Sequence, residues 1–523
     1  MRRLFVGGAF LLFSLLEPIQ ANSTTLPQPA ANKTDSVAAR AGKTARPNIL
    51  FIILDDWGWN HSGAYGSDWV KTPNFDRLAR EGVLFKNAFT SNPKCSPCRA
   101  SILTGRNSWQ LEEAASHFGV FPSKFVVYPD LLEDSGYTVG YTGKGWGPGD
   151  FKAGGFKRNP AGPSFAEFKS SPPTTGIGRN DYARNFEAFL QQRSNDQPFC
   201  FWIGFNEPHR AYEQHSGVRS GKRLQDAQVP GYLPDTDVVR GDLLDYAVEV
   251  EWADSHIGKA LQLLEASGEL DNTLIVVTSD HGMPFPFVKG QVFEDGFRLP
   301  LVMRWGTTVK AGRVVEDFIN VRDFAPTFLE VAGLKPHGQM TGRSLVKTLR
   351  SEKSGWIDKS QNVMLTGKER HDLGRPNDLG YPVRAIRTTE FLYVHNFFPD
   401  RWPAGNPETD FGNCDGGPTK ELLKALGGDY YDLSFGKRPQ QALFRLSDDP
   451  ECIRNLAPDP FFTPTMEKLR AKMFTMLREE KDPRALGNGA IFDTYKYTGG
   501  RQKSYDTWLK QQATKLKAGA DGR

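Results

Sequence analysis

Short apolar runs that end abruptly in polar residues recur along the first half of the chain. The clearest one, Asn48–Leu54, is almost continuously apolar and is followed at once by Asp55 and Asp56. A run of this length without alternation is typical of a strand that is buried on both faces of a sheet. Three further strands are predicted at residues 137–142, 199–205 and 274–278, and they lead into Gly143-Lys144, the segment 206–209 and Ser279-Asp280-His281.

Amphipathic segments lie between these predicted strands. Residues 74–80 form a short helical pattern that stops at Gly82, and residues 242–266 form a long one. The apolar face of the long segment carries Leu243, Tyr246, Val250, Ile257, Leu261 and Leu264. Strands that alternate with helices predict an α/β fold, a large, mostly parallel or mixed sheet flanked by helices. Because ligands bind at the carboxyl ends of such strands, the polar residues that follow them should gather at one edge of the sheet.

The pattern changes after about residue 385. Residues 387–396 and 441–446 have the pattern of strands, and residues 465–480 have that of a helix. We therefore predict a main domain at residues 47–385, a smaller C-terminal α+β subdomain at 386–510 and a tail at 511–523. No repeat of fixed period is present in the sequence, which argues against solenoids and propellers.

The N-terminus has the composition of an export signal. Two arginines precede the apolar residues 4–16, and Ala21 follows at a suitable cleavage position. The apolar run is shorter than the roughly 20 residues that a membrane-spanning helix needs, so no stable membrane anchor is expected. We predict a signal peptide at residues 1–21, a disordered linker at 22–46, and a periplasmic or secreted protein, or a lysosomal one if the source is eukaryotic.

Composition narrows the function only slightly. The chain is 39% hydrophobic, and its net charge of +4 arises from basic and acidic residues that are spread along the sequence. Without a basic block, nucleic-acid binding is not expected. Five cysteines are an odd number for an exported protein, and Cys414 and Cys452, both in the C-terminal part, could form a disulfide bond.

The sharpest local signal is the segment 95–106, which reads CSPCRASILTGR. Taken alone, Cys95 could be an ordinary thiol in a loop before a helix. The whole segment, however, resembles the signature C-x-P-x-R followed by L-T-G-R of the sulfatase family, and the resemblance extends over residues 46–456. It implies that a separate formylglycine-generating enzyme oxidises Cys95 to formylglycine. The hydrate of this aldehyde carries two hydroxyl groups, so one can take the sulfate and the other can expel it by C–O cleavage.

The resemblance also implies one calcium ion per chain. Its expected ligands are the strand-end residues Asp55, Asp56, Asp280 and His281, together with the modified Cys95. Many members of the family have asparagine where this chain has the histidine. A hard cation held by carboxylate oxygens would polarise the sulfate and lower the pKa of the formylglycine hydroxyl. Outside this resemblance, an Asp-Asp pair after a strand is more often a helix cap or a turn.

Four further residues match positions that have catalytic roles in the family. His209 matches the histidine that protonates the leaving group, and Lys289 matches a lysine that contacts a sulfate oxygen. Arg99 is expected to brace the formylglycine and the calcium ligands. Lys144 matches the lysine of a G-K-x-H segment.

The chain departs from the family pattern at Trp146, which replaces the histidine of that segment. That histidine normally hydrogen-bonds the formylglycine hydroxyl and is a candidate base for the release of sulfate. Indole cannot accept a proton. Either Trp146 supplies only an N–H donor and packing, or another group such as His117 takes the position, or turnover is organised differently.

Within the family, the chain is most similar to the heparan N-sulfatases (sulfoglucosamine sulfohydrolases). The similarity includes residues 208–210, 280–286 and 381–384, whereas residues 369–379 follow their own course. We expect a sulfated saccharide or polysaccharide as substrate, with an O-sulfate or an N-sulfate removed. The candidate substrate-binding residues are Arg210, Arg370, His371, Arg375 and Trp146.

Two other functions stay open at this point. One is a phosphonate monoester or phosphodiester hydrolase of the same alkaline-phosphatase-like superfamily, since sulfate and phosphate differ in charge and little in shape. The other is a non-catalytic carbohydrate-binding relative, in which Cys95 stays a thiol.

Overall fold

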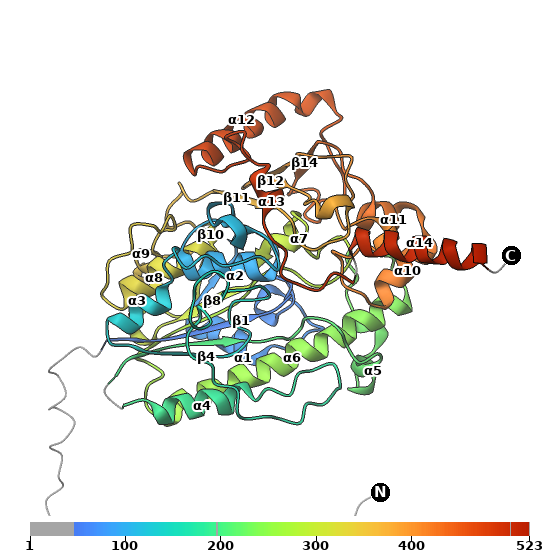
Figure 1. Cartoon of the computed structure of the whole chain (residues 1–523). Helices are drawn as coiled ribbons and strands as arrows, with labels where there is room; N and C mark the ends of the chain where they lie inside the picture. The colour runs from blue at the N-terminus through green and yellow to red at the C-terminus, as the bar shows by residue number, and fades with distance from the viewer. Residues whose placement is uncertain (1–45, 195–196, 503, 522–523) are drawn as a thin grey trace, which may run out of the picture. The chain divides into compact units, whose positions relative to one another are not determined.

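A mixed seven-stranded sheet forms the centre of the fold (Figure 1). The computed structural model describes residues 46–194, 197–502 and 504–521, which lie in one compact unit. In spatial order the strands are β4 (Thr138–Gly143), β5 (Phe199–Gly204), β1 (Asn48–Leu54), β6 (Thr273–Ser279), β8 (Leu301–Arg304), β2 (Val83–Phe85) and β9 (Arg313–Val315). The first four strands are parallel, and β8 is antiparallel to both of its neighbours.

The parallel strands end in register, and this alignment positions the polar residues that follow them. Leu54 pairs with Ser279, and Gly143 pairs with Gly204. Gly143 has a φ of 73°, a conformation that glycine adopts without strain, so the chain can turn there into Lys144. The residues after these strands therefore meet at one edge of the sheet, where ligands of such sheets bind.

Alternate side chains of β1 pack into two hydrophobic cores on opposite faces of the sheet. Leu50 and Ile52 belong to one core, and Phe51 and Ile53 to the other. One face is covered by α1 (Pro73–Glu81), α4 (Tyr182–Gln192) and α6 (Asp237–Ala266). The other face is covered by α2 (Cys95–Thr104), α3 (Tyr128–Asp134) and α8 (Phe324–Val331). Figure 1 shows the two helix layers on either side of the sheet, which explains why the sequence of β1 is apolar throughout.

The predicted fold class is confirmed. β1 has the predicted bounds, and the strands predicted at 137–142, 199–205 and 274–278 are present with ends shifted by one residue. α6 begins earlier than predicted, at Asp237. Its first turn is capped by the side chain of Thr236, which accepts a hydrogen bond from the backbone N–H of Val239.

The later part of the chain forms a second, antiparallel sheet. Its strands are β11 (Val363–Lys368), β12 (Val383–Thr388), β13 (Phe391–Asn396) and β14 (Gln441–Arg445). The single strand predicted at 387–396 is wrong, because the chain turns between β12 and β13. Oγ1 of Thr388 accepts a hydrogen bond from the backbone N–H of Phe391 (3.0 Å) in that turn. The boundary predicted at residue 385 falls inside β12, and β11 precedes it in the chain.

Short strands and helices complete the described residues. A small sheet consists of β10 (Ile319–Asn320), β3 (Ala88–Phe89) and β7 (Arg298–Leu299). The remaining helices are α5 (Ser216–Arg219), α7 (Glu294–Phe297), α9 (Val346–Arg350), α10 (Pro418–Leu426), α11 (Gly428–Phe435), α12 (Thr463–Glu479), α13 (Ile491–Thr494) and α14 (Tyr505–Asp521). The helix predicted at residues 465–480 is present as α12, and it covers the second sheet. The predicted tail at 511–523 is helical as far as Asp521.

Two further predictions concern the disulfide bond and the signal peptide with its linker. All five cysteines are buried free thiols, so the disulfide bond between Cys414 and Cys452 is absent. The predicted signal peptide and the linker, up to residue 45, lie outside the described residues. Among the helices of the described ranges, none is long and apolar enough to span a bilayer.

A buried ionic network ties β12 to the segment that follows α12. Nε and Nη2 of Arg384 donate to the carboxylate of Asp482 at 2.8 and 2.9 Å, and Nη2 also donates to Glu369 at 2.8 Å. Arg484 donates to the other oxygen of Glu369 (2.8 Å). Two guanidinium groups thus neutralise two carboxylates in the interior, and the network holds only if all four groups are present.

We expect the substitution Arg384→Met to lower the free energy of unfolding by about 3–5 kcal/mol, because it leaves buried carboxylates without a cation. The control is Arg223→Met, which breaks an exposed pair with Asp226 and should leave the free energy of unfolding almost unchanged, because solvent screens that pair. Urea unfolding of the two variants beside the wild type measures both effects. Equal losses for the two variants would contradict the importance of the buried network.

Candidate active site

Cys95 is the first residue of α2, a helix that is buried along its whole length. Lys94 precedes the helix in an extended conformation, and Gly105 ends it with a φ of 65°. Pro97 suits the first turn, where its missing N–H would have no partner in the helix. Cys95 therefore lies at the helix N-terminus, where free N–H groups and the helix dipole favour an anion.

The ends of β1 and β6 bring acidic groups to Cys95. One ligand atom each from Asp55, Cys95, Asp280 and His281 lies within 4.8 Å of the others. Nε2 of His281 is 3.5 Å from Sγ of Cys95 and 3.0 Å from Oδ1 of Asp56. Asp56 has a φ of 75°, and its backbone N–H donates to Oδ1 of Asp280 (3.2 Å). The structure thus brings together all five residues that the sequence predicted as metal ligands.

The donor set of this cluster fits a hard divalent cation. Nδ1 of His281 donates to the carbonyl oxygen of Gly282 (3.1 Å), so its Nε2 faces the carboxylate of Asp56. Two acceptors that face each other require a cation or a proton between them. Oδ1 of Asp55 is buried and has no hydrogen-bond partner among the described residues. Carboxylate oxygens are the ligands that calcium prefers, so the residues present fit such an ion.

Three cationic side chains neutralise the buried carboxylates. The pairs are Arg99 with Asp280, Lys144 with Asp55 and Lys289 with Asp56. Nε of Arg99 is 3.0 Å from Oδ2 of Asp280, and Nζ of Lys289 is 2.6 Å from Oδ1 of Asp56. Since the three acids already have three cations, a divalent ion would give the site a net positive charge. Such a site favours a sulfate anion.

The electrostatic environment of Cys95 favours an ionised group. Burial raises the pKa of the Cys95 thiol and so does Asp55, but Lys144, Lys289 and His117 lower it to well below its ordinary value. Reactive cysteines have such a depressed pKa, whereas an inert buried thiol has a raised one. Position 95 is therefore built to stabilise negative charge.

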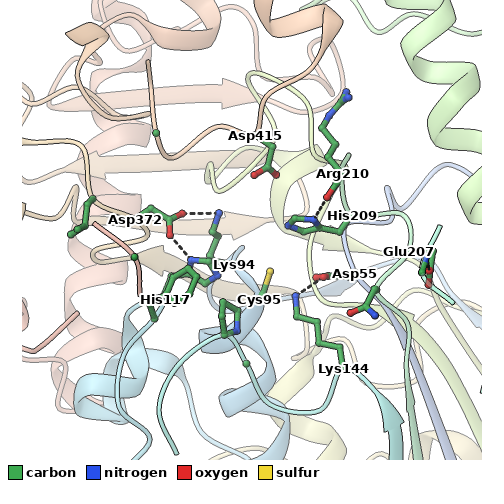
Figure 2. Close-up of a pocket in the computed structure, with 18 of the residues that line it drawn as sticks. Asp55, Lys94, Cys95, His117, Lys144, Glu207, His209, Arg210, Asp372 and Asp415 are labelled. Carbon is green, nitrogen blue, oxygen red and sulfur yellow. Dashed lines mark hydrogen bonds and ion pairs between the residues drawn. The ribbon is translucent and has the colours of Figure 1, made fainter. Parts of the chain in front are cut away.

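A cavity of about 830 Å³ borders Cys95 (Figure 2). Of the residues predicted for the site, its wall contains Asp55, Cys95, Lys144, His209 and Arg210. The volume is in the range of sites that enclose small ligands. Nδ1 of His209 donates to the carbonyl oxygen of Arg210 (2.6 Å), and its side chain is 36% exposed. Nε2 of His209 is therefore the nitrogen that remains for a ligand.

Arg210 borders the cavity, but its donors are already in use. Nη1 and Nη2 each donate to the carboxylate of Asp242 at 2.7 Å, and Nε donates to the carbonyl oxygen of Pro284 (2.9 Å). Figure 2 shows its guanidinium group directed away from Cys95. Arg210 therefore braces the loop after β5 against α6, and the predicted role in binding substrate does not fit this geometry.

The other four candidate substrate-binding residues lie in the interior and do not line the cavity. They are Arg370, His371, Arg375 and Trp146. Arg375 donates to three oxygen atoms of neighbouring loops, and Nε2 of His371 lies 2.9 Å from Oδ1 of Asn92. Nη2 of Arg370 donates to the carbonyl oxygen of Tyr495 (2.7 Å). These contacts hold loops together, so the structure does not bring the side chains into the cavity wall.

Other residues of the cavity wall were not among the predicted site residues. They are Lys94, His117, Phe118, Glu207, Glu249, Asp372, Asp415 and Tyr497. Asp372 directly follows His371. The loop that the sequence indicated therefore borders the cavity, but through Asp372 and not through His371. Lys94 adjoins Cys95 in the chain, and His117 was considered only as a substitute for a missing histidine. No motif in the sequence indicated Asp415 or Tyr497.

Comparisons with known proteins agree with this geometry. A family model described as Sulfatase matches residues 47–334. N-sulphoglucosamine sulphohydrolase of Homo sapiens is 30% identical over 84% of this chain and 91% of its own. A solved structure in complex with its substrate D-glucosamine-2-N,6-O-disulfate is 21% identical, with a TM-score of 0.63 over 84% of this chain and 98% of that chain. Phosphonate monoester hydrolase of Agrobacterium radiobacter is 20% identical, with a TM-score of 0.59 over 84% of this chain and 97% of that chain.

The two structural likenesses, at this level of identity, establish the fold. The family model spans more than half of the chain, and the human relative is similar along most of its length. The chain belongs to the sulfatase family. It is therefore a sulfuric-ester hydrolase, and the family and enzyme class predicted from residues 95–106 are confirmed.

One acidic residue of the cavity wall has a strongly raised pKa. Glu249 on α6 is buried, and its Oε1 has no hydrogen-bond partner among the described residues. Burial raises the pKa of Glu249 to about 9, and the neighbouring Glu207 contributes to the increase. A carboxyl group with a raised pKa in the folded state binds its proton more tightly there than in the unfolded chain, where the pKa is about 4.3.

The free energy of unfolding should therefore fall as the pH rises from about 4.3 toward about 9, because the unfolded chain loses the Glu249 proton over this range and the folded protein keeps it. We expect Glu249→Gln to leave the melting temperature unchanged near pH 4 and to raise it at pH 8. The corresponding gain in the free energy of unfolding at pH 8 is on the order of a few kcal/mol. The matched control is the exposed Glu330→Gln on α8. If both variants show the same pH dependence in thermal melts, the buried carboxyl is not the cause.

Proposed function

We propose that this sulfatase removes an O-sulfate or an N-sulfate from a saccharide, with formylglycine at position 95 and one calcium ion. The position of Cys95 supports this most directly. It begins a buried helix, lies 3.5 Å from His281 and forms part of the cavity wall. A residue in this place faces both the strand-end carboxylates and any ligand in the cavity.

Formylglycine suits this position because of its surroundings. Sγ of Cys95 marks the place that an oxygen of the aldehyde hydrate would take, next to Lys144 and Lys289 in the electrostatic field of the site. The hydrate supplies one hydroxyl group to take the sulfate and a second one to release it. A formylglycine-generating enzyme is the partner that the conversion of Cys95 requires.

Calcium would be held by Asp55, Asp56, Asp280 and His281, together with the modified side chain at position 95. When bound, the ion polarises the sulfate oxygens and lowers the pKa of the attacking hydroxyl group. Arg99 keeps the carboxylate of Asp280 in place through the hydrogen bond from Nε (3.0 Å). Arg99 thus holds this ligand carboxylate in position before an ion binds.

The departing oxygen or nitrogen would receive its proton from His209. Its Nδ1 is fixed by the carbonyl oxygen of Arg210, so Nε2 is the atom that can hold and give a proton in the cavity. Lys289 is bound to Asp56 and, at 3.1 Å, to Asp415. We assign Lys289 the role of keeping these carboxylates neutralised near the sulfate.

A saccharide suits the rest of the cavity wall. The aromatic rings of Phe118 and Tyr497, with centroids 5.2 Å apart, form one part of it, and Glu207, Glu249 and Asp415 lie in other parts. Aromatic faces pack against the apolar faces of sugar rings, and the oxygen atoms of carboxyl groups accept hydrogen bonds from hydroxyl groups. The names of the human relative and of the substrate in the solved complex point to sulfated glucosamine.

We further propose that the chain is exported to the periplasm or secreted, as its N-terminal sequence indicates.

The proposal is tested by purified wild type and Cys95→Ala on defined O- and N-sulfated oligosaccharides, a phosphate diester and a phosphonate monoester. We expect the wild type to release sulfate and the variant to lose about 10³-fold or more of the activity, since its nucleophile is missing. Mass spectrometry of the peptide containing residue 95 reports the conversion to formylglycine.

Each alternative has its own outcome in this assay. Faster cleavage of the phosphonate or phosphate ester would identify the related hydrolase. A wild type that binds the oligosaccharides without turnover, with a thiol at position 95, would identify a carbohydrate-binding protein. Sulfate release by the alanine variant at the rate of the wild type would rule out the nucleophile.

Removal of calcium should lower activity and thermal stability together, because the ion binds only the native state. At a calcium concentration about 100 times the Kd, the stabilisation is about 2.7 kcal/mol. Melting curves with a chelator and after addition of calcium measure it. The variant Asp280→Asn should lose the response, whereas Asp235→Asn, at an exposed aspartate, should keep it. Superimposable curves with and without chelator would show that no such site exists.

A further inference from the structure

Trp146 does not take over the role of the histidine that it replaces. Its indole ring is buried, and Nε1 donates to the carbonyl oxygen of Ser96 (3.1 Å). The ring packs against Phe121, with centroids 5.0 Å apart. Trp146 therefore supports the first turn of α2 from inside the protein, and indole cannot accept a proton. Release of sulfate needs an acceptor from another part of the chain.

His117 has the geometry of such an acceptor. Its side chain is 8% exposed and lines the same cavity as Cys95 (Figure 2). Nδ1 lies 2.6 Å from Oδ1 of Asp372. An ionised carboxylate can only accept a hydrogen bond, so Nδ1 carries the hydrogen and Nε2 carries the free lone pair.

Nε2 of His117 has no hydrogen-bond partner among the described residues, although it is buried. A buried polar atom without a partner costs free energy, and proteins keep few of them. At the wall of a cavity and beside the nucleophile, such an atom is available for a group on the reacting residue or on the ligand.

Asp372 is held in place from two other sides. Nζ of Lys94 lies 3.1 Å from its Oδ2, and the hydroxyl group of Tyr497 donates to its Oδ1 at 3.4 Å. Burial raises the pKa of Asp372, but His117 and Lys94 lower it to well below its ordinary value. The carboxylate is therefore charged, and it orients the imidazole, as a carboxylate does behind a catalytic histidine.

The backbone around His117 is constrained as well. Phe118 has a φ of 51°, a left-handed conformation that non-glycine residues rarely adopt. The backbone N–H of His117 donates to the carbonyl oxygen of Arg370 (3.1 Å), and that of Thr498 donates to Phe118 (2.8 Å). Segments far apart in the sequence thus fix His117 in one orientation.

We propose that His117, oriented by Asp372, accepts the proton when sulfate leaves the enzyme, a step that rests on the proposed function. Nε2 takes the proton of the free hydroxyl group of the sulfated formylglycine hydrate. The electrons of that O–H bond form the C=O bond of the aldehyde. The C–O bond to sulfate breaks, and its electron pair leaves with the sulfate dianion. No oxidant or further reactant is needed.

The test uses His117→Ala, with formylglycine confirmed by mass spectrometry, and 4-nitrophenyl sulfate as the probe. Because the first step stays intact, we expect a burst of one 4-nitrophenolate per converted chain. Steady-state turnover should then fall by about 10²–10⁴-fold, the usual contribution of a general base. The intact protein should carry one added sulfate group. Added imidazole should restore part of the turnover, since the cavity has room for it.

Two further variants make the result specific. His117→Gln fills the same space without a basic nitrogen and should behave like the alanine variant, which covers the case in which that variant does not fold. His337→Ala removes a histidine that does not line the cavity and should turn over like the wild type.

The inference is overturned if either His117 variant keeps turnover within a few fold of the wild type. It is also overturned if a folded, formylglycine-containing variant loses the burst together with the turnover, or if imidazole has no effect. A wild type that contains formylglycine but releases no sulfate from any probe would overturn the proposed function itself. The two failures are therefore distinguishable.

Discussion

The neutralisation of three buried carboxylates by three buried cations is the interaction on which the rest of the site depends. Asp55, Asp56 and Asp280 are taken out of water at the ends of two strands, and a buried carboxylate without a partner costs several kcal/mol. Each receives its own cation from a different element: α2 supplies Arg99, the turn after β4 supplies Lys144, and the segment after β6 supplies Lys289. Catalytic function and stability are therefore coupled at these positions.

The same constraint connects the later part of the chain to the active site. Asp372 pairs with Lys94, the residue before the nucleophile, and Asp415 pairs with Lys289. Tyr497 joins them from the segment before α14. Cys95 begins α2 and the acidic cluster follows the ends of β1 and β6, whereas the cavity wall also contains several residues from beyond β11. A change of substrate within this fold can therefore arise in the later segments while the charged centre stays the same.

Position 146 carries tryptophan where the family pattern has histidine, although the acidic cluster around Cys95 is complete. The indole ring occupies the interior and supports the start of α2. His117, from the segment between α2 and α3, reaches the cavity, and it is oriented by a carboxylate from beyond β11.

Sequence and structure decided different parts of this picture. The strands of the main sheet could be predicted because a doubly covered strand must be apolar along its whole length, and the segment 95–106 carried the family in one short stretch. The hairpin of β12 and β13 could not be predicted, since a turn held by Thr388 interrupts an otherwise continuous pattern.

The candidate site divides in the same way. Asp55, Asp56, Cys95, Asp280 and His281 follow from motifs and strand ends, which are local features. Whether Arg375 or Asp372 faces the cavity depends on how one loop packs against its neighbours, and the sequence of the loop contains no signal for it. The sequence by itself determined the candidate nucleophile Cys95 and the acidic centre, because a motif and a strand end are encoded locally. Only the tertiary structure decided the surroundings of His117, the cavity wall and the partners of the buried charges, because these depend on contacts between segments that are far apart in the chain.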